Sequence, residues 1–586
     1  MTALRLHAQP SPIDAPAPGR RNPRKAAAAL EQGRSRLVVT AAMFAFAFVA
    51  VGVGLVDATV LRQGAEPDIA QAQPAGLLQT GRADIVDRNG AVLATSLASA
   101  SLYADPLLVI DPVEAADKLT AALPDLDYDA LVRQLASDKR FVWIKRKLTP
   151  REQYAVNRLG IPGVAFQREE RRIYPLGPLA SHTVGFTGVD NDGLMGIEQS
   201  FDQALRGTPE PLALSIDARV QHLVRRELQA AIDEFSGIGG AGMVMDLETG
   251  ELLAQVSLPD FDPNAPMNLD ENTRFNRTSL GVYEMGSTFK IFNSALAFES
   301  GKIGLSSSFD ATHPIRVGRH TIGDFRGKNR WLTVPEIFIY SSNIGSVRMA
   351  LEVGTEAQRA LMAKLGLLSR PSIEIPEVGM PMVPNPWREI NTMTISFGHG
   401  LSVSPLQLVA AAGAIINGGV MRQPTLLRRD PGEPVLGERV VSPQTSAMMR
   451  RMLRLVVTEG SATAAAAPGY VVGGKTGTAE KITGRGYNRK SRISSFLGAF
   501  PIHDPKYLVL VMIDEPKGTA RTHGFATGGW VAAPAGGRII AQLGPMLGVE
   551  PVDENRPDIR QAVDLFAAPA PATGGGTTGG STLASY

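Results

Sequence analysis

A serine and a lysine are spaced for catalysis in the stretch Glu284–Lys290, which reads Glu-Met-Gly-Ser-Thr-Phe-Lys. Ser287 and Lys290 are three residues apart, so on a helix their side chains project from the same face. Apolar residues follow at helical spacing, which predicts a helix buried on most sides. A buried ammonium is costly unless it loses its proton, and a neutral lysine beside a serine hydroxyl is a base beside a nucleophile.

A second short motif, Ser341-x-Asn343, lies in the stretch Tyr340–Gly345. A serine hydroxyl can relay a proton, and the Asn343 amide could contact a substrate or Lys290. Each motif alone has a simpler interpretation, in which the serine caps a helix and Lys290 is solvated. The two motifs therefore become informative only together with a third.

The third motif, Gly473–Thr478, reads Gly-Gly-Lys-Thr-Gly-Thr and has two interpretations. The longer stretch Gly469–Thr476 fits the Walker A phosphate-binding pattern letter by letter. That pattern requires a lysine that opens a helix after a strand. Here Gly477 follows the Lys-Thr pair at once, and Ser461–Gly469 does not have the pattern of a strand. The sequence therefore disfavours a nucleotide site.

An extended edge strand is the favoured interpretation of the third motif. On such a strand Lys475 presents its charge to a carboxylate, and Thr476 and Thr478 offer hydroxyl groups. Gly474 and Gly477 leave the surface of the strand open. The three motifs together then supply a nucleophile, a base and groups that bind an anion.

The composition excludes several other kinds of chemistry. The 586 residues carry a formal net charge of +2, which gives no long-range field for a nucleic acid. There is no cysteine, so disulfides, thiolate catalysis and cysteine metal sites are excluded. The 8 histidines are scattered, without a His-Glu-x-x-His run. We therefore expect no metal, no cofactor and no nucleic-acid partner.

The N-terminal part has the pattern of a membrane anchor. Residues 1–36 form a basic tail and are followed by 20 uncharged residues, Leu37–Val56, which span about 30 Å as a helix. The basic flank predicts a single-pass anchor of the cytoplasmic membrane over 37–57, with a cytoplasmic N-terminus and an exported remainder. A signal peptide cleaved at Val56–Ala58 is the alternative, but the apolar run is longer than a signal sequence needs.

The exported part divides into two domains and a tail. Residues 58–211 begin with a polar linker, have an amphipathic, helical stretch at 112–160, and are expected to form a pedestal or interaction domain. Residues 212–548 carry the three motifs between early and late strands, which predicts a mixed α+β domain. Residues 549–586 end in a Gly-, Ala-, Thr- and Pro-rich stretch and are expected to be disordered.

The order Ser-x-x-Lys, Ser-x-Asn, Lys-Thr-Gly is the set that penicillin-binding proteins and serine β-lactamases share. Over nearly its whole length the chain resembles a class B penicillin-binding protein, a monofunctional peptidoglycan transpeptidase. This implies an antiparallel sheet flanked by helices on an elongated pedestal domain. Ala83 and Met285 depart from the glycine and the proline that are usual in the family. Further segments that resemble family motifs are Arg82–Gly90, Arg172–Gly185, Gly193–Glu198, Ser396–Gly400 and Gly528–Pro534.

Within the family the chain is most similar to the division-specific type, because Tyr283-Glu284 precedes Gly286-Ser287. The elongation-specific type, which more often has a proline in place of Glu284, is an alternative. A catalytically silent division scaffold is another, which the complete set of motifs disfavours. A β-lactam-sensing or β-lactam-hydrolysing enzyme is a third, which the anchor and the large pedestal disfavour.

The resemblance implies septal D,D-transpeptidation of peptidoglycan stem peptides that end in D-Ala-D-Ala. Ser287 would attack the penultimate D-Ala carbonyl, while Lys290, kept neutral by burial and by the charge of Lys475, takes its proton. The backbone N–H groups of Ser287 and Thr478 would form the oxyanion hole. Ser341 would pass the proton to the leaving D-Ala.

The resemblance also implies how substrates and partners bind. Asn343 would contact the peptide amide, and the amine of a neighbouring stem peptide would attack the acyl-enzyme. A β-lactam would instead leave a long-lived adduct. The implied protein partners are a membrane glycan polymerase of the FtsW type and other division proteins. The groups implied to hold the substrate carboxylate are Lys475, Thr476, Gly477 and Thr478.

Overall fold

The computed structural model describes residues 38–39, 41–49, 51, 81–266, 270–318, 320–430, 432–483 and 486–565. The chain divides into two compact units, residues 1–79 and residues 80–586. The expected basic tail over 1–36 and part of the expected anchor over 37–57 lie outside the described residues. In the part of the chain that the structure describes, no helix is long and apolar enough to cross a membrane.

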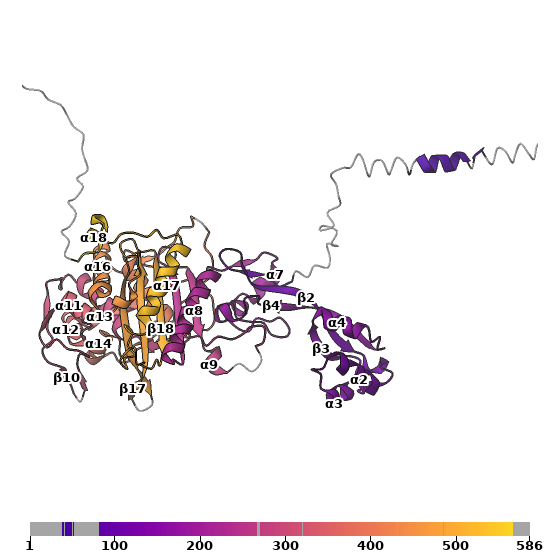
Figure 1. The fold of residues 1–586 in the computed structure, drawn as a ribbon, viewed down its shortest axis with the longest axis horizontal. Helices are drawn as coiled ribbons and strands as arrows, with labels where there is room; N and C mark the ends of the chain where they lie inside the picture. Colours follow the sequence, from indigo (N-terminus) through magenta and orange to yellow (C-terminus); the bar gives the residue numbers. More distant parts are fainter. Residues whose placement is uncertain are drawn as a thin grey trace, which may run out of the picture. The chain divides into compact units, whose positions relative to one another are not determined.

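The second unit begins with a five-stranded sheet in which β3, β2, β1 and β5 are neighbours and β4 also pairs with β2 (Figure 1). A tight turn joins β1 to β2, where the Asp87 carboxylate accepts hydrogen bonds from the backbone N–H groups of Asn89 and Ala91. The elements of this pedestal domain are β1 (Ile85–Val86), β2 (Val92–Ala104), η2 (Pro106–Leu108), α2 (Pro112–Ala122), α3 (Tyr128–Leu135), β3 (Val142–Leu148), α4 (Pro150–Asn157), β4 (Val164–Ile173), η3 (Gly177–Ala180), α5 (Ser181–Val184), α6 (Gly196–Ser200), α7 (Asp202–Gly207) and β5 (Leu212–Ala213).

One end of the pedestal domain, which we call the head, has a core of its own. Helices α2, α3 and α4 pack there against β2, β3 and β4. The expectation of helix throughout 112–160 is wrong for Val142–Leu148, which forms β3 and pairs with β2. Three apolar residues are followed there by three charged ones, so the segment lacks the alternation that would mark a half-buried strand in the sequence. The fully buried leucines of the head are Leu102, Leu119, Leu123 and Leu135.

A buried ion cluster connects the three pedestal segments that resemble family motifs. The Glu198 carboxylate is fully buried and accepts hydrogen bonds from Arg82 and, at 2.7 Å, from Arg172 Nε. Arg82 also forms an ion pair with Asp202 at 2.6 Å. A buried carboxylate is tolerated only with such partners, so this cluster holds three distant segments in one arrangement.

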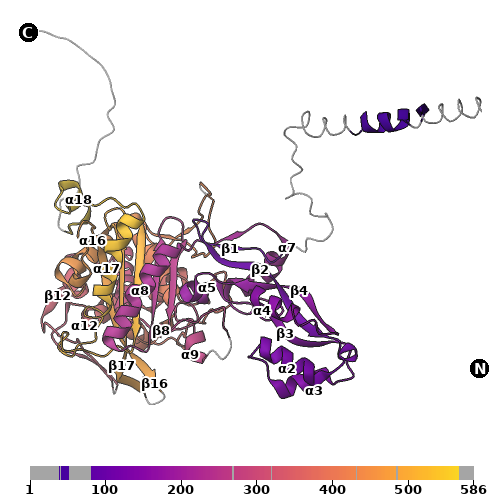
Figure 2. The same cartoon turned by 45° about the vertical axis from the view of Figure 1, so that its right-hand side comes forward.

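The second domain is built on an antiparallel sheet in the order β16-β17-β18-β6-β7 (Figures 1 and 2). Gly242 on β6 lies against Val224 of α8, whereas Met245, three residues further on, contacts Gly413 of α15. Successive residues of a strand face opposite sides, so α8 and α15 cover opposite faces of the sheet. The expected α+β fold, an antiparallel sheet flanked by helices, is thereby confirmed.

The elements of this domain are α8 (Ala218–Phe235), β6 (Gly239–Asp246), β7 (Leu252–Leu258), α9 (Glu271–Arg274), β8 (Tyr283–Glu284), η4 (Gly286–Phe289), α10 (Lys290–Glu299), β9 (Ser308–Asp310), β10 (Ile315–Val317), β11 (His320–Ile322), β12 (Trp331–Thr333), α11 (Val334–Ile339), α12 (Asn343–Val353), α13 (Thr355–Lys364), α14 (Glu389–Ile395), β13 (Ser402–Val403), α15 (Pro405–Ile416), β14 (Val420–Met421), β15 (Glu438–Arg439), α16 (Pro443–Glu459), η5 (Thr463–Ala465), β16 (Gly473–Thr483), β17 (Gly486–Phe500), β18 (Tyr507–Asp514) and α17 (Ala532–Met546).

Residues 549–565 depart from the disorder expected for 549–586. They include α18 (Pro557–Val563), which packs against α16. Ile559 and Val563 are four residues apart, so they share a helix face, and both are buried. Arg451 of α16 also donates a hydrogen bond to the carbonyl oxygen of Ala562. The remainder of the expected tail, residues 566–586, lies outside the described residues.

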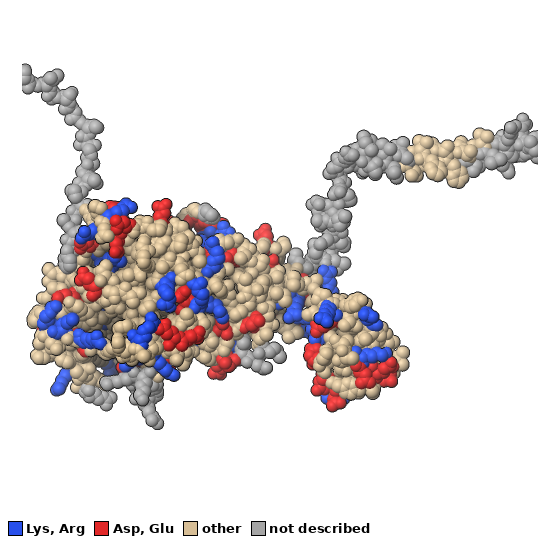
Figure 3. Space-filling view, in the orientation of Figure 1, with Lys and Arg blue, Asp and Glu red and all other residues tan. Residues whose placement is uncertain are grey.

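The surface carries charges of both signs. On the face drawn in Figure 3, basic and acidic side chains are interspersed over both domains of the second unit. This mixture agrees with the small net charge of +2. A single-sign field of the kind that attracts nucleic acids is not present on that face.

Candidate active site

Two of the three sequence motifs meet at the side chain of Lys290. Ser287 lies in η4, and Lys290 follows one turn later as the first residue of α10. Lys290 Nζ lies 2.8 Å from Ser287 Oγ and 2.7 Å from Asn343 Oδ1. Ser341 Oγ lies 3.3 Å from the same nitrogen. The structure thus brings together the serine, the lysine and the Ser-x-Asn pair that the sequence singled out.

The environment of Lys290 favours its neutral form. The side chain is almost fully buried, at 1% exposure. Burial, and then the nearby charge of Lys475, lower its pKa well below the usual value, while Asp324 acts weakly in the opposite direction. A neutral amine has a free lone pair, so Lys290 can accept the proton of Ser287.

A second buried lysine lies on the other side of Ser341. Lys475 Nζ is 3.2 Å from Ser341 Oγ and 3.2 Å from the carbonyl oxygen of Thr476. Its side chain is fully buried, and this burial lowers its pKa to about 7. The hydroxyl of Ser341 therefore bridges two amines, as a proton relay requires.

The position of Lys475 decides between the two interpretations of its motif. It lies inside β16, which is the edge strand of the sheet. A Walker A lysine would open a helix, so the P-loop alternative is wrong, and the expectation of an extended edge strand is confirmed.

Two glycines allow η4 to approach β16. Gly286 has φ of 55°, and a side chain there would collide with the carbonyl oxygen of Thr478. Gly398 has φ of 85°, and a side chain there would collide with the backbone of Gly286. Only glycine suits both positions, because of the positive φ and of the close contact. The backbone of Ser287 thereby comes next to that of Thr478.

The residues expected to bind a carboxylate differ in accessibility. Thr476 is buried, and its Oγ1 lies 2.6 Å from Ser461 Oγ. Gly477 is buried against η4. Thr478 is partly exposed, and its Oγ1 accepts a hydrogen bond from the Gly528 N–H at 3.0 Å. The Thr478 hydroxyl is therefore the most accessible of these groups, and it can still donate its own proton to a carboxylate.

Asp324 is a functional candidate that the sequence analysis missed. Its carboxylate accepts hydrogen bonds from the Ser342 hydroxyl at 2.7 Å and from the backbone N–H groups of Asn343 and Ile344 at 2.5 and 3.1 Å. These groups follow Ser341, which has φ of 55°, a strained value for a non-glycine residue. Asp324 thus fixes the start of α12.

The residue before Asp324 orients the Asn343 amide. Asn343 Nδ2 donates a hydrogen bond to the Gly323 carbonyl oxygen at 3.1 Å, which leaves Oδ1 facing Lys290. No spacing rule links residues 323–324 to the Ser-x-Asn motif. A Gly-Asp pair predicts only a turn, so the sequence alone could not assign these two residues to the candidate site.

His399 is a second buried titratable group at the site. Burial, and then the proximity of Lys290, lower the pKa of the His399 imidazole to about 4. The imidazole is therefore neutral at neutral pH. The next residue, Gly400, donates its N–H to Glu284 Oε1 at 2.6 Å, which ties this loop to the approach to Ser287.

The described residues contain no group of three or more His, Asp or Glu side chains that could bind a metal ion. The chemistry at this site rests on a serine hydroxyl between amines and amide groups. Such a set suits acyl transfer, in which a serine ester forms and is then attacked by a second nucleophile.

Comparisons with known proteins identify the class. Residues 240–540 match the model of the penicillin binding protein transpeptidase domain, and residues 78–230 match that of the penicillin-binding protein dimerisation domain. The chain belongs to the penicillin-binding protein transpeptidase family. Within this family it is a class B protein of the FtsI type.

The similarity to known proteins extends over both domains. The probable peptidoglycan D,D-transpeptidase FtsI of Caulobacter vibrioides is 40% identical, with 90% of this chain and 91% of that protein covered. The peptidoglycan D,D-transpeptidase FtsI of Escherichia coli is 31% identical, with 81% and 85% covered. Penicillin-binding protein 3 of Mycobacterium tuberculosis, solved in complex with aztreonam, has the same fold at a TM-score of 0.64 and 24% identity, with 81% and 97% covered.

Proposed function

We propose that this chain, a peptidoglycan D,D-transpeptidase of the FtsI type, cross-links septal stem peptides through an acyl-enzyme on Ser287. The relatives named FtsI and the matched transpeptidase domain support the activity. The observation that carries the residue assignment is the contact of 2.8 Å between Ser287 Oγ and the buried Lys290 Nζ. A nucleophile paired with a neutral base is what acyl transfer at neutral pH requires.

In the first half-reaction Ser287 Oγ attacks the carbonyl carbon of the penultimate D-Ala, and Lys290 Nζ accepts the hydroxyl proton. The backbone N–H groups of Ser287 and Thr478 stabilise the negative charge on the carbonyl oxygen. The proton passes through Ser341 Oγ to the nitrogen of the terminal D-Ala, which leaves as the peptide bond breaks. The contacts of Ser341 with both Lys290 and Lys475 support this route.

Substrate binding uses the charge of Lys475 and the hydroxyl of Thr478. The terminal D-Ala carboxylate is anionic, so it is attracted by the Lys475 ammonium and accepts a hydrogen bond from Thr478 Oγ1. Thr476 and Gly477 support this strand from within, and the Asn343 amide contacts the peptide backbone. In the second half-reaction the amine of a neighbouring stem peptide attacks the ester, which releases Ser287 and forms the cross-link.

Intact mass spectrometry with benzylpenicillin tests the assignment. A β-lactam acylates the same serine, and its ring-opened product keeps the acceptor out, so we expect one stable penicilloyl adduct per chain. Ser287→Ala should give none while remaining folded. Absence of an adduct on the folded parent protein, or rapid release of hydrolysed penicillin, would contradict the proposal.

We further propose that residues 37–57 anchor the chain in the cytoplasmic membrane, with 58–211 as the pedestal and 212–548 as the catalytic domain on the periplasmic side. The uncharged run of 20 residues after a basic tail supports the anchor. A polymerase of the FtsW type and other division proteins are the partners we expect. A Ser287→Ala chain that still sustains division would instead favour the scaffold alternative.

A further inference from the structure

The loop that carries Asp324 is strongly basic and lies at the edge of the candidate site. Residues 323–331 read Gly-Asp-Phe-Arg-Gly-Lys-Asn-Arg-Trp. Arg326, Lys328 and Arg330 are exposed, and no acidic residue occurs between Asp324 and Glu336. The Asp324 carboxylate already accepts three hydrogen bonds at the start of α12. The loop is therefore fixed to the Ser-x-Asn motif and presents cations beside it.

The three cations of this loop differ in their partners. Arg330 forms an ion pair of 2.6 Å with Glu336. Within the described residues, Arg326 and Lys328 form no ion pair with a carboxylate and rest on aromatic rings instead. Lys328 Nζ lies 4.5 Å from the ring centre of Tyr340, and Arg326 Cζ lies 5.1 Å from that of Phe525. A ring face orients a cation without neutralising it, so both charges remain available to an anion.

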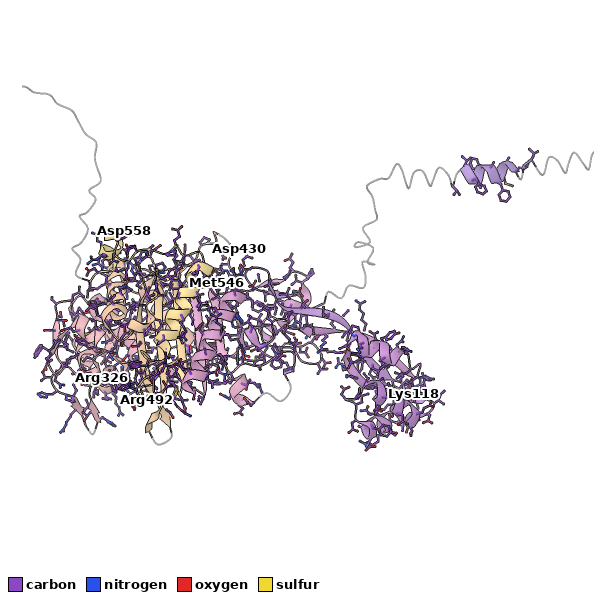
Figure 4. The ribbon with its side chains drawn as sticks, in the orientation of Figure 1. Lys118, Arg326, Asp430, Arg492, Met546 and Asp558 are labelled. Carbon is purple, nitrogen blue, oxygen red and sulfur yellow. The ribbon has the colours of Figure 1, made fainter. Side chains whose placement is uncertain are left out.

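The two rings belong to opposite sides of the site. Tyr340 directly precedes Ser341. Phe525 lies three residues before Gly528, whose N–H donates to Thr478 Oγ1. Arg326, labelled in Figure 4, thus joins the loop of the Ser-x-Asn side to a segment that contacts the Lys-Thr-Gly strand. The two charges are exposed on this loop, whereas Lys290 and Lys475 are buried.

We propose that Arg326 and Lys328 form an anion-binding rim for an acidic residue of the stem peptide. This inference rests on the proposed function. A stem peptide carries carboxylates ahead of its D-Ala-D-Ala end, and the terminal carboxylate occupies the Lys475 strand. An upstream carboxylate then reaches the rim, where two oriented cations attract it. The rim selects an acidic peptide over an amidated one, a distinction that the buried site cannot make.

Competition against a fluorescent penicillin tests this selectivity on the full-length protein in detergent. Two synthetic peptides ending in D-Ala-D-Ala are compared, one with its upstream carboxylate free and one with it amidated. The measured quantity is the concentration of each that halves the rate of acylation of Ser287. We expect the free acid to compete about fivefold better, as one exposed charge-assisted contact allows, and high salt to narrow the difference.

Charge-removing variants locate the selectivity. Arg326→Gln and Lys328→Gln combined should bring the ratio for the two peptides close to one. Arg330→Gln is the matched control, because it removes a cation of the same loop that is already paired with Glu336, and it should keep the ratio of the parent protein.

Two outcomes would contradict the proposal. In one, the free-acid and amidated peptides compete equally well for the parent protein. In the other, the double variant binds both peptides more weakly by the same factor, so that their ratio stays as in the parent protein. Failure of the underlying function looks different, since then no penicillin adduct forms, or neither peptide competes with any form of the protein.

Discussion

Ser341 Oγ lies 3.3 Å from Lys290 Nζ and 3.2 Å from Lys475 Nζ, so one hydroxyl separates two buried amines. Two ammonium groups this close repel each other, and burial penalises each of them further. Burial lowers the pKa of Lys475 to about 7, whereas the pKa of Lys290 is lowered by burial and, in addition, by the charge of Lys475. The division of roles between base and cation follows from this difference.

The rate of acylation by benzylpenicillin should therefore have two pH limbs. Acylation needs a neutral Lys290, so the rate rises with pH as Lys290 loses its proton. It also needs a charged Lys475, so the rate falls again above about pH 7, where Lys475 becomes neutral. Lys475→Arg keeps the charge at all these pH values, and the alkaline fall should disappear. An alkaline limb that is the same in this variant would assign that limb to another group.

At the scale of elements, Asp324 holds the N-terminus of α12 in place. Asp324→Asn leaves one acceptor oxygen for three donors, so Ser341 and Asn343 lose their fixed position. We expect acylation by benzylpenicillin to slow about tenfold. Because Asp324 also raises the pKa of Lys290, the acid limb should move to lower pH.

Asp111→Asn is the matched control for Asp324→Asn. Asp111 caps α2 in the head and accepts hydrogen bonds from the N–H groups of Val113 and Glu114 at 2.9 and 3.1 Å. Asn caps a helix about as well as Asp, so Asp111→Asn should cost little stability, and only Asp324→Asn should change acylation and its pH profile. An equal effect of the two variants on acylation would reduce Asp324 to a structural cap.

The three motifs were predictable because acyl transfer restricts the residue types and because one helical turn fixes the spacing of Ser287 and Lys290. The groups that position them were not, since Asp324 and Gly323 come from a loop whose path depends on tertiary contacts. The same limit explains β3, whose sequence has no strand period and which becomes a strand through its pairing with β2.

The buried Glu198 cluster gives a second prediction at this scale. Glu198→Gln leaves Arg172 without a counter-charge and Arg82 with Asp202 alone, which should lower the free energy of unfolding by about 3 kcal/mol. Unfolding in urea measures this loss of free energy. Glu114→Gln, which breaks an exposed ion pair with Lys118, should cost less than about 0.5 kcal/mol. Comparable losses in both variants would mean that the cluster contributes no more than a surface pair.

At the scale of the whole molecule, we expect the units that unfold cooperatively to differ from the two domains. The part of the pedestal next to the catalytic domain shares a core with it, including Ile85, Tyr174 and Ile197. Asn264 also bonds the backbone of Tyr174 twice, at 2.9 and 3.0 Å. The head, by contrast, packs around its own separate core. The catalytic domain and the adjoining pedestal should therefore unfold together, and the head apart from them.

Hydrogen exchange before and after acylation by benzylpenicillin measures this boundary. A group bound only to the folded state stabilises every amide that exchanges through the same opening. Slowed exchange should therefore extend from the catalytic sheet to β1 and to the Tyr174 amide, although neither contacts the antibiotic. The amides of α2 and α3 in the head should keep their exchange rates. In Ser287→Ala, benzylpenicillin should change the exchange rate of no amide. Protection confined to residues 212–548 would place the boundary at the domain junction, and protection that reaches the head would make the second unit a single cooperative structure.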